Sequence, residues 1–157
     1  MSALPLISVL LTCFNRKALT LRLLASLFRQ QQLQAELCIL VVDDGCSDGT
    51  ADAIRQQFPQ VHVVAGTGQL YWCGGMRLAQ QQLANVLPRA ADYQLWLNDD
   101  VELDDDALAR LLKQTQALQA SHRVGAVVGA VRSLTGSTLT YGGRKSLSRW
   151  LPLRMSA

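Results

Sequence analysis

The sequence lacks a long hydrophobic run, although 49% of its 157 residues are hydrophobic. Its longest apolar runs, LPLISVLL (4–11) and LCILVV (37–42), are far shorter than the roughly 20 residues that a membrane span needs. The apolar segment at the N-terminus is not preceded by the basic region of a secretory signal peptide. The high apolar content excludes a disordered chain, and we expect a soluble, cytoplasmic protein of single-domain size.

The sequence also lacks CxxC spacing and a basic stripe with interleaved aromatic residues. Because the chain has ample core residues, we expect its four cysteines to be free thiols rather than a disulfide framework or a metal site: Cys13, Cys38, Cys46 and Cys73. The net charge of +3 comes from basic residues scattered through most of the chain, so we expect no nucleic-acid partner.

Strand-like and helix-like segments alternate from the start of the chain. Continuous apolar runs predict strands that are covered on both faces, at 7–13, 36–44, 61–65, 93–98 and 124–131, with a short sixth at 138–143. Apolar stripes at helical spacing predict helices at 17–31, 51–58, 76–87 and 105–119. Repeated βα units indicate an α/β fold with a mostly parallel sheet, right-handed crossovers and helices on both faces.

Ligands of such sheets bind beyond the carboxyl ends of the strands, near a switch in strand order. Four predicted strands are followed by polar, Gly-rich or acidic segments: TCFNR (12–16), DDGCSDGT (43–50), GQLYWCGG (68–75) and NDDVELDDD (98–106). These segments are where we expect a binding site.

The segment 98–106 holds six of the twelve acidic residues of the chain. Side chains alternate along a strand, so Asn98 and Asp100 should share a side while Asp99 points elsewhere, unless the chain has already turned. Asp100 is then the better ligand for Mg²⁺ or Mn²⁺, supported by Asn98 or Asp99. The acids at 104–106 fall at the start of an amphipathic helix, where we expect them to cap the helix and interact with its dipole.

The pair Asp43–Asp44 closes a strand of apolar residues, and a carboxylate buried there needs hydrogen-bond donors. We favour ligand binding for this pair, since an acceptor at a strand end can bind the N–H edge of a nucleobase. The alternative is that Asp44 accepts N–H groups within the turn 45–50. For Asp48 we favour capping of the next helix.

The loop 66–77, GTGQLYWCGGMR, combines flexible glycines with aromatic residues and an arginine. Free N–H groups at a helix start, together with Arg77, could hold phosphate oxygens. The alternative is ordinary helix entry with Tyr71 and Trp72 packed in the core. The segment 12–16 could line the same cleft through Thr12, Phe14, Asn15 and Arg16.

Together these segments resemble a family 2 glycosyltransferase with the Rossmann-like GT-A fold. The resemblance spans residues 6–143 and rests on the text ISVLLTCFNR, VVDDGCSDGT, GQLYWCGGMRLA and LWLNDDV. The wording LYWCGG and LNDDV is similar to the rhamnosyltransferase-like branch of the family. We therefore expect a nucleotide-sugar-binding GT-A domain over residues 1–143.

The resemblance implies transfer of a sugar, with inversion, from a nucleotide diphosphate sugar to the hydroxyl of a saccharide or lipid-linked acceptor, in cell-envelope polysaccharide biosynthesis. Thr12 and Asp44 would contact the nucleobase beside Asp43, while Asp99 would reach the ribose or the sugar. Asp100 would coordinate Mg²⁺ or Mn²⁺, with Asn98. The donor site as a whole would comprise Thr12, Phe14, Asn15, Asp43, Asp44, Trp72, Gly74, Gly75, Arg77 and Asp99.

The sequence departs from the family pattern at Phe14, where the family often has Tyr, and at Arg77, where it often has Asn. The Glu-Asp motif that supplies the catalytic base should follow residue 143, yet no acid occurs after Asp106. We expect a donor site without its base, in a truncated chain, a natural fragment or a non-catalytic nucleotide-sugar-binding module. The basic tail 144–157 would then begin a missing acceptor-side segment, or contact an anionic inner membrane surface.

Overall fold

The computed structural model describes residues 3–121, 126–133, 139–141, 144–145 and 154–155. The chain divides into two compact units, residues 1–105 and 106–157, each of which is considered by itself. Most of the predicted basic tail, residues 146–153, lies outside the described residues. Among the described residues, no helix combines the length and the apolar character needed to cross a bilayer.

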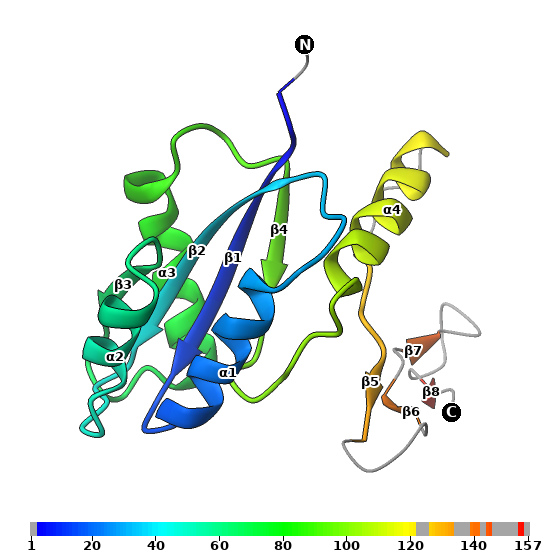
Figure 1. Cartoon of the computed structure of the whole chain (residues 1–157). Helices are drawn as coiled ribbons and strands as arrows, with labels where there is room; N and C mark the ends of the chain where they lie inside the picture. Colours follow the sequence, from blue (N-terminus) through cyan, green and yellow to red (C-terminus); the bar gives the residue numbers. More distant parts are fainter. Residues whose placement is uncertain (1–2, 122–125, 134–138, 142–143, 146–153, 156–157) are drawn as a thin grey trace. The chain divides into compact units, whose positions relative to one another are not determined.

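The first unit is built on a parallel sheet of four strands, in the order β3-β2-β1-β4 (Figure 1). The strands are β1 (Leu6–Cys13), β2 (Glu36–Asp43), β3 (His62–Ala65) and β4 (Tyr93–Trp96). Because β1 lies between β2 and β4, the strand order switches direction at β1. The predicted α/β fold with a parallel sheet is confirmed.

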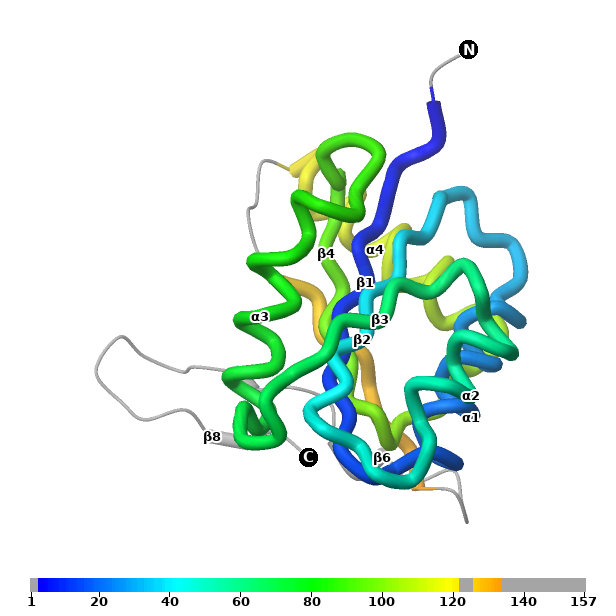
Figure 2. Tube along the Cα trace, turned by 90° about the vertical axis from the view of Figure 1, so that its left-hand side faces the viewer, coloured from blue at the N-terminus to red at the C-terminus, as the bar shows by residue number. Residues whose placement is uncertain are grey.

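Three helices cover the sheet: α1 (Lys17–Phe28), α2 (Thr50–Gln57) and α3 (Tyr71–Val86). Figure 2 shows α3 on one side of the sheet and α1 and α2 on the other. The face toward α3 buries a core made of Leu10, Leu40, Val42, Met76, Ala79 and Leu83. The continuous apolar character of β1 and β2 follows from this double cover, since seven of the eight residues of β1 and five of the eight residues of β2 are buried.

The helix α3 begins earlier than its sequence predicts. Residues 71–75 were expected in a Gly-punctuated loop, but α3 starts at Tyr71 and includes both Gly74 and Gly75. The backbone N–H groups of Leu70 and Tyr71 are accepted by the carboxylate of Asp44, which provides the partner that a helix start requires. Glycine costs only about 1 kcal/mol in a helix, so this tertiary cap can override its low propensity.

The second unit contains α4 (Ala107–Ala120) and the short antiparallel pairs β5 (Val131–Arg132) with β6 (Leu139–Tyr141), and β7 (Arg144–Lys145) with β8 (Arg154–Met155). The predicted buried strand at 124–131 is wrong at residues 126–130, which are not a strand and include the exposed Val128; only Val131 lies in a strand, β5. The glycines and alanines of the predicted strand have low strand propensity and offer little side chain to bury.

The acids at 104–106 stand at the start of α4 as predicted, but Asp106 does not form the predicted capping hydrogen bond. Asp106 occupies the position before the helix, but its side chain makes no capping hydrogen bond and pairs instead with Arg110. The carboxylate of Asp105 accepts a hydrogen bond from Nε of Arg29, at 2.9 Å. Arginines thus bind the carboxylates of Asp105 and Asp106, two of the three acids that were predicted to cap the helix.

Candidate functional site

Asp99 and Asp100 follow β4 and meet the same arginine, which follows β1. Nη1 of Arg16 lies 3.3 Å from Oδ1 of Asp99 and 3.0 Å from Oδ2 of Asp100. The strand ends at Trp96 and the chain has turned at the two acids, so strict alternation does not apply to them. Asp99 is buried, whereas Asn98 and Asp100 are exposed. Both carboxylates therefore share one cation at the carboxyl ends of β1 and β4.

The burial of Asp99 raises its pKa. Loss of solvent raises the pKa of this carboxyl above its usual value, and the charge of Asp100 raises it further, against the opposing effect of the Arg16 guanidinium. The site thus holds a partly dehydrated carboxylate beside an exposed one, and the guanidinium compensates both.

Asp44 connects the end of β2 to the start of α3. Its side chain is 4% exposed, and its Oδ1 accepts the N–H of Gly68 at 2.8 Å. Its Oδ2 accepts the N–H groups of Leu70 and Tyr71, at 2.8 and 3.1 Å. The partners come from the 66–71 loop, not from the turn 45–50 that the alternative interpretation of Asp44 required. Both oxygens of Asp44 are thus used by backbone donors.

Asp43 lies beside two thiols. Its Oδ1 accepts the N–H of Cys46 at 2.7 Å, and the Sγ atoms of Cys13 and Cys46 are 3.9 Å apart. Burial raises the pKa of both thiols, and Cys46, Asp43 and Asp99 raise that of Cys13 further. Asp43 and Asp99 therefore both lie close enough to Cys13 to affect its charge. All four cysteines are free thiols, as predicted.

The turns after β1 and β2 are joined by side chains. Oδ1 of Asn15, a residue with φ of 51°, accepts the N–H of Ser47 at 2.8 Å. The carboxylate of Asp48 accepts the N–H of Thr50 at 3.1 Å and that of Lys17 at 3.0 Å. These bonds, together with the hydroxyl of Thr50, lower the pKa of Asp48. Asp48 thus binds the first N–H of both α1 and α2, although the formal capping position of α2 is Gly49.

The start of α3 packs tightly against β1. A Cβ added at Gly75 would lie 2.7 Å from Cβ of Thr12, so only glycine permits this approach. Tyr71 and Trp72 are both exposed, which excludes the alternative that they pack in the core. The ring of Trp72 instead meets that of Trp96 edge to face, with centroids 6.0 Å apart. Arg77 is also exposed.

The structure thus brings several predicted residues together at the carboxyl edge of the sheet. Contacts join Thr12 to Gly75, Asn15 to the turn after β2, and Asp44 to the start of α3. Phe14, Trp72, Asn98 and Arg77 are exposed at segments that follow or precede the strand ends. The ion pairs of Arg16, a residue expected to line the cleft, and the aromatic contact of Trp96 were not predicted, although Trp96 lies only three residues before Asp99.

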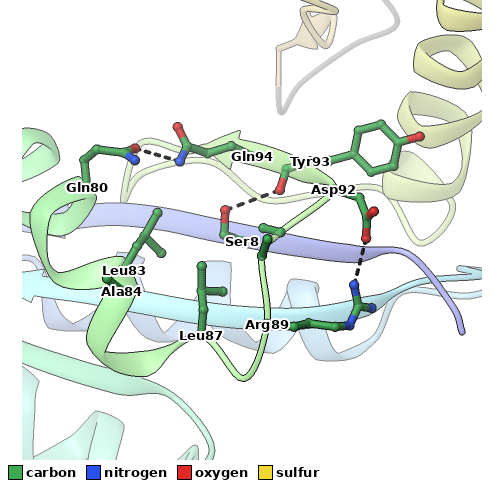
Figure 3. Close-up of a pocket in the computed structure, with 11 residues that line it drawn as sticks. Ser8, Gln80, Leu83, Ala84, Leu87, Arg89, Asp92, Tyr93 and Gln94 are labelled. Atoms are coloured by element: carbon green, nitrogen blue, oxygen red, sulfur yellow. Dashed lines mark hydrogen bonds and ion pairs between the residues drawn. The ribbon is translucent and has the colours of Figure 1, made fainter.

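A separate cavity of about 740 Å³ lies at the amino ends of β1 and β4, beside the end of α3 (Figure 3). Its polar side chains are largely paired with one another. The amide of Gln94 donates to Gln80 at 2.6 Å, and Arg89 contacts Asp92 at 2.9 Å. None of the residues predicted to bind the donor lines this cavity, so it is not the expected site.

Comparisons with known proteins bear on what this edge binds. A family model described as "Glycosyl transferase family 2" matches residues 8–154. A search of curated proteins finds no match.

Two solved structures with similar folds illustrate the likeness. A mannosyltransferase from Pyrobaculum calidifontis, in complex with GDP-Man and Mn²⁺, superposes with a TM-score of 0.59 at 20% identity, over 69% of this chain and 32% of that one. TarS from S. aureus gives a TM-score of 0.63 at 20% identity, over 84% of this chain and 22% of that one. The chain therefore spans a third or less of the length of these proteins.

Proposed function

The chain belongs to glycosyl transferase family 2, and from this premise we propose that it binds a nucleotide diphosphate sugar at the carboxyl ends of β1, β2 and β4. The bound sugar would be transferred to an acceptor hydroxyl, with inversion and with the help of a divalent metal. The fold is that of GT-A glycosyltransferases, and in open α/β sheets ligands bind where the strand order switches. Here that point lies between the carboxyl ends of β1 and β4.

The observation that carries the proposal is the convergence of Arg16, Asp99 and Asp100 at this point. A nucleotide diphosphate is anionic, and both a guanidinium and a carboxylate-bound cation are its usual partners. Arg16 supplies the guanidinium, and the carboxylates of Asp99 and Asp100 can bind the cation, so this strand end offers both kinds of group.

Asp43 and Asp44, at the end of β2, form different hydrogen bonds and are therefore assigned different roles. Asp44 has both oxygens engaged by backbone donors, so we assign it to holding the start of α3. Oδ1 of Asp43 accepts one backbone N–H, and its side chain is half-buried at the strand end. We therefore propose that Asp43, with Thr12 nearby, contacts the nucleobase, and that the exposed ring of Phe14 stacks on it. Asn15 would support this pocket by fixing the turn beside it.

The residues after β4 fit a hard divalent cation. Asp100 and Asn98 are exposed and offer oxygen donors, which suit Mg²⁺ or Mn²⁺. Asp100 would hold the cation, with Asn98 or Asp99 in support. When bound, the cation supplies positive charge to the diphosphate leaving group. Arg16 compensates the same carboxylates, and Asp99 would reach the ribose or the sugar.

The start of α3 would complete the donor site. Gly74 and Gly75 keep the helix start free of side-chain bulk, and Gly75 allows close approach to β1. Trp72 and Arg77 are exposed beside them, where Arg77 can neutralise phosphate charge.

The proposals for the branch of the family, the acceptor and the pathway rest on two short sequence motifs. LYWCGG and LNDDV support a rhamnosyltransferase-like branch, a saccharide or lipid-linked acceptor, and a role in cell-envelope polysaccharide biosynthesis at the inner membrane surface. The described residues include no acid that we assign as the base. A nucleotide-sugar-binding module without turnover is therefore the second candidate.

Sugar transfer and hydrolysis should be measured with UDP, dTDP and GDP sugars in Mn²⁺, alongside binding of each donor. In Asp100→Asn we expect Mn²⁺-dependent donor affinity to fall at least about tenfold, or about 1.4 kcal/mol. Glu102→Gln is the matched control, because the Glu102 side chain is 43% exposed, close to the 46% of Asp100, and also pairs with an arginine. Equal affinities in the two variants would refute the metal assignment. Binding without turnover would favour the second candidate.

A further inference from the structure

Two cysteines that are distant in the sequence meet beside an aspartate at the ends of β1 and β2. The Sγ atoms of Cys13 and Cys46 are 3.9 Å apart, and one oxygen of Asp43 lies with them so that all three atoms are within 4.8 Å of one another. The spacing of the cysteines did not predict this cluster, because it depends on the parallel pairing of β1 and β2. It is distinct from the Asp99–Asp100 carboxylates that we assign to the hard cation.

The distance between the two sulfurs matches that of a tetrahedral thiolate site. Two sulfur ligands at about 2.3 Å from a zinc ion lie about 3.8 Å apart when the angle at the metal is tetrahedral. The observed separation of 3.9 Å already meets this requirement. The carboxylate oxygen of Asp43 lies within 4.8 Å of both sulfurs and completes a set of three ligands.

The ligand types select the ion. Thiolates favour soft or borderline cations such as Zn²⁺, whereas Mg²⁺ and Mn²⁺ favour oxygen ligands. Two sulfurs and one carboxylate oxygen therefore do not form a second site for the cation that we assign to Asp100. They form a site of different chemistry on the neighbouring strand ends.

The cluster is held in place by its surroundings, as metal ligands commonly are. The N–H of Asn15 donates to Sγ of Cys46 at 3.2 Å, and the N–H of Cys46 donates to the Asp43 carboxylate at 2.7 Å. The thiol of Cys13 is buried at the base of the cluster, while Cys46 and Asp43 are half-buried. An ion can thus enter from the side of Cys46, where water can supply a further ligand.

We propose that Cys13, Cys46 and Asp43 bind one thiophilic divalent cation of the Zn²⁺ class, with water in the fourth position. On binding, each thiol releases its proton to solvent and each sulfur forms a bond to the metal. The site requires only the fold of the first unit and does not depend on the proposed sugar transfer.

Cobalt(II) is the probe for this site, because thiolate coordination gives a sulfur-to-cobalt absorption in the near ultraviolet and tetrahedral coordination gives strong visible bands. The full chain, kept reduced with a phosphine, should bind one Co²⁺ with both features, and Zn²⁺ should displace it. Cys46→Ser should weaken Co²⁺ binding at least about tenfold and reduce the sulfur band. Cys73→Ser, which removes an exposed thiol outside the cluster, should change neither.

Cys13→Ser changes a buried side chain, so its folding is checked by circular dichroism, and Cys46→Ser remains the deciding variant. The proposal is overturned if the wild-type chain shows no sulfur-to-cobalt band. It is equally overturned if Cys46→Ser binds Co²⁺ as the wild type does, or if the band is lost in Cys73→Ser.

Discussion

Replacing Asp44 by Asn tests whether this residue holds the start of α3. The carboxylate accepts three backbone N–H groups, from Gly68, Leu70 and Tyr71. An Asn side chain has one oxygen, so in either orientation its NH₂ group faces one or two of these donors. Hydrogen bonds to a charged group contribute about 1.5–3 kcal/mol each. Losing one or two of them should lower the free energy of unfolding by about 1.5–6 kcal/mol.

The assay is urea unfolding followed by circular dichroism, with Asp52→Asn as the matched control. Asp52 lies on α2, pairs only with Arg55 among the described residues, and its side chain is 90% exposed. Because an exposed ion pair contributes about 0–1 kcal/mol, the control should change stability by no more than about 1 kcal/mol. Amide hydrogen exchange should accelerate at Gly68, Leu70 and Tyr71 in Asp44→Asn. Equal stability losses in the two variants would refute the structural role of Asp44.

Three further predictions follow from individual contacts. Gly75→Ala places a Cβ against Thr12 and should cost about 1–3 kcal/mol in urea unfolding, whereas Gly129→Ala, with no atom within 4 Å, should cost far less. The raised pKa of Asp99 contributes stability that is present below its unfolded pKa of about 3.9 and is lost as pH rises through the native pKa. Asp99→Asn should therefore become more stable relative to the wild type in urea unfolding between pH 4 and pH 7. An unchanged difference in stability between the two proteins would contradict this. If both proposed sites exist, Zn²⁺ should weaken nucleotide binding by the wild type in calorimetry, because Asp43 belongs to both, and should not do so in Cys46→Ser.

The fold of the first unit could be predicted because its strands are continuous apolar runs and its helices have clear apolar stripes. The predicted strand at 124–131 failed because small apolar residues satisfy a hydropathy pattern without offering side chains that stabilise a strand. The early start of α3 could not be seen locally, since the partner of its first N–H groups is Asp44, some 26 residues earlier.

The candidate site was predictable where a motif coincided with a strand end, as for Asp43, Asp99 and Asp100. Contacts between segments were harder to predict from the sequence. Arg16 is separated in the sequence by 83 and 84 residues from the two acids that follow β4, and Cys13 is separated from Cys46 by 33 residues. Residues so far apart in the sequence are brought together by the strand order, which places β4 beside β1. The carboxylate of Asp105 was likewise predicted to cap α4, and it pairs instead with Arg29, which tertiary structure brings to it.

The central claim is that the carboxyl edge of β1, β2 and β4 binds a nucleotide diphosphate sugar. Calorimetric titration of the chain with UDP, dTDP and GDP sugars, with and without Mn²⁺, tests it most directly. We predict saturable, Mn²⁺-enhanced binding of at least one of these donors, weakened in Asp43→Asn and unchanged in Asp52→Asn. Absence of binding by all three donors in Mn²⁺, in a chain that is folded by circular dichroism, would contradict the claim.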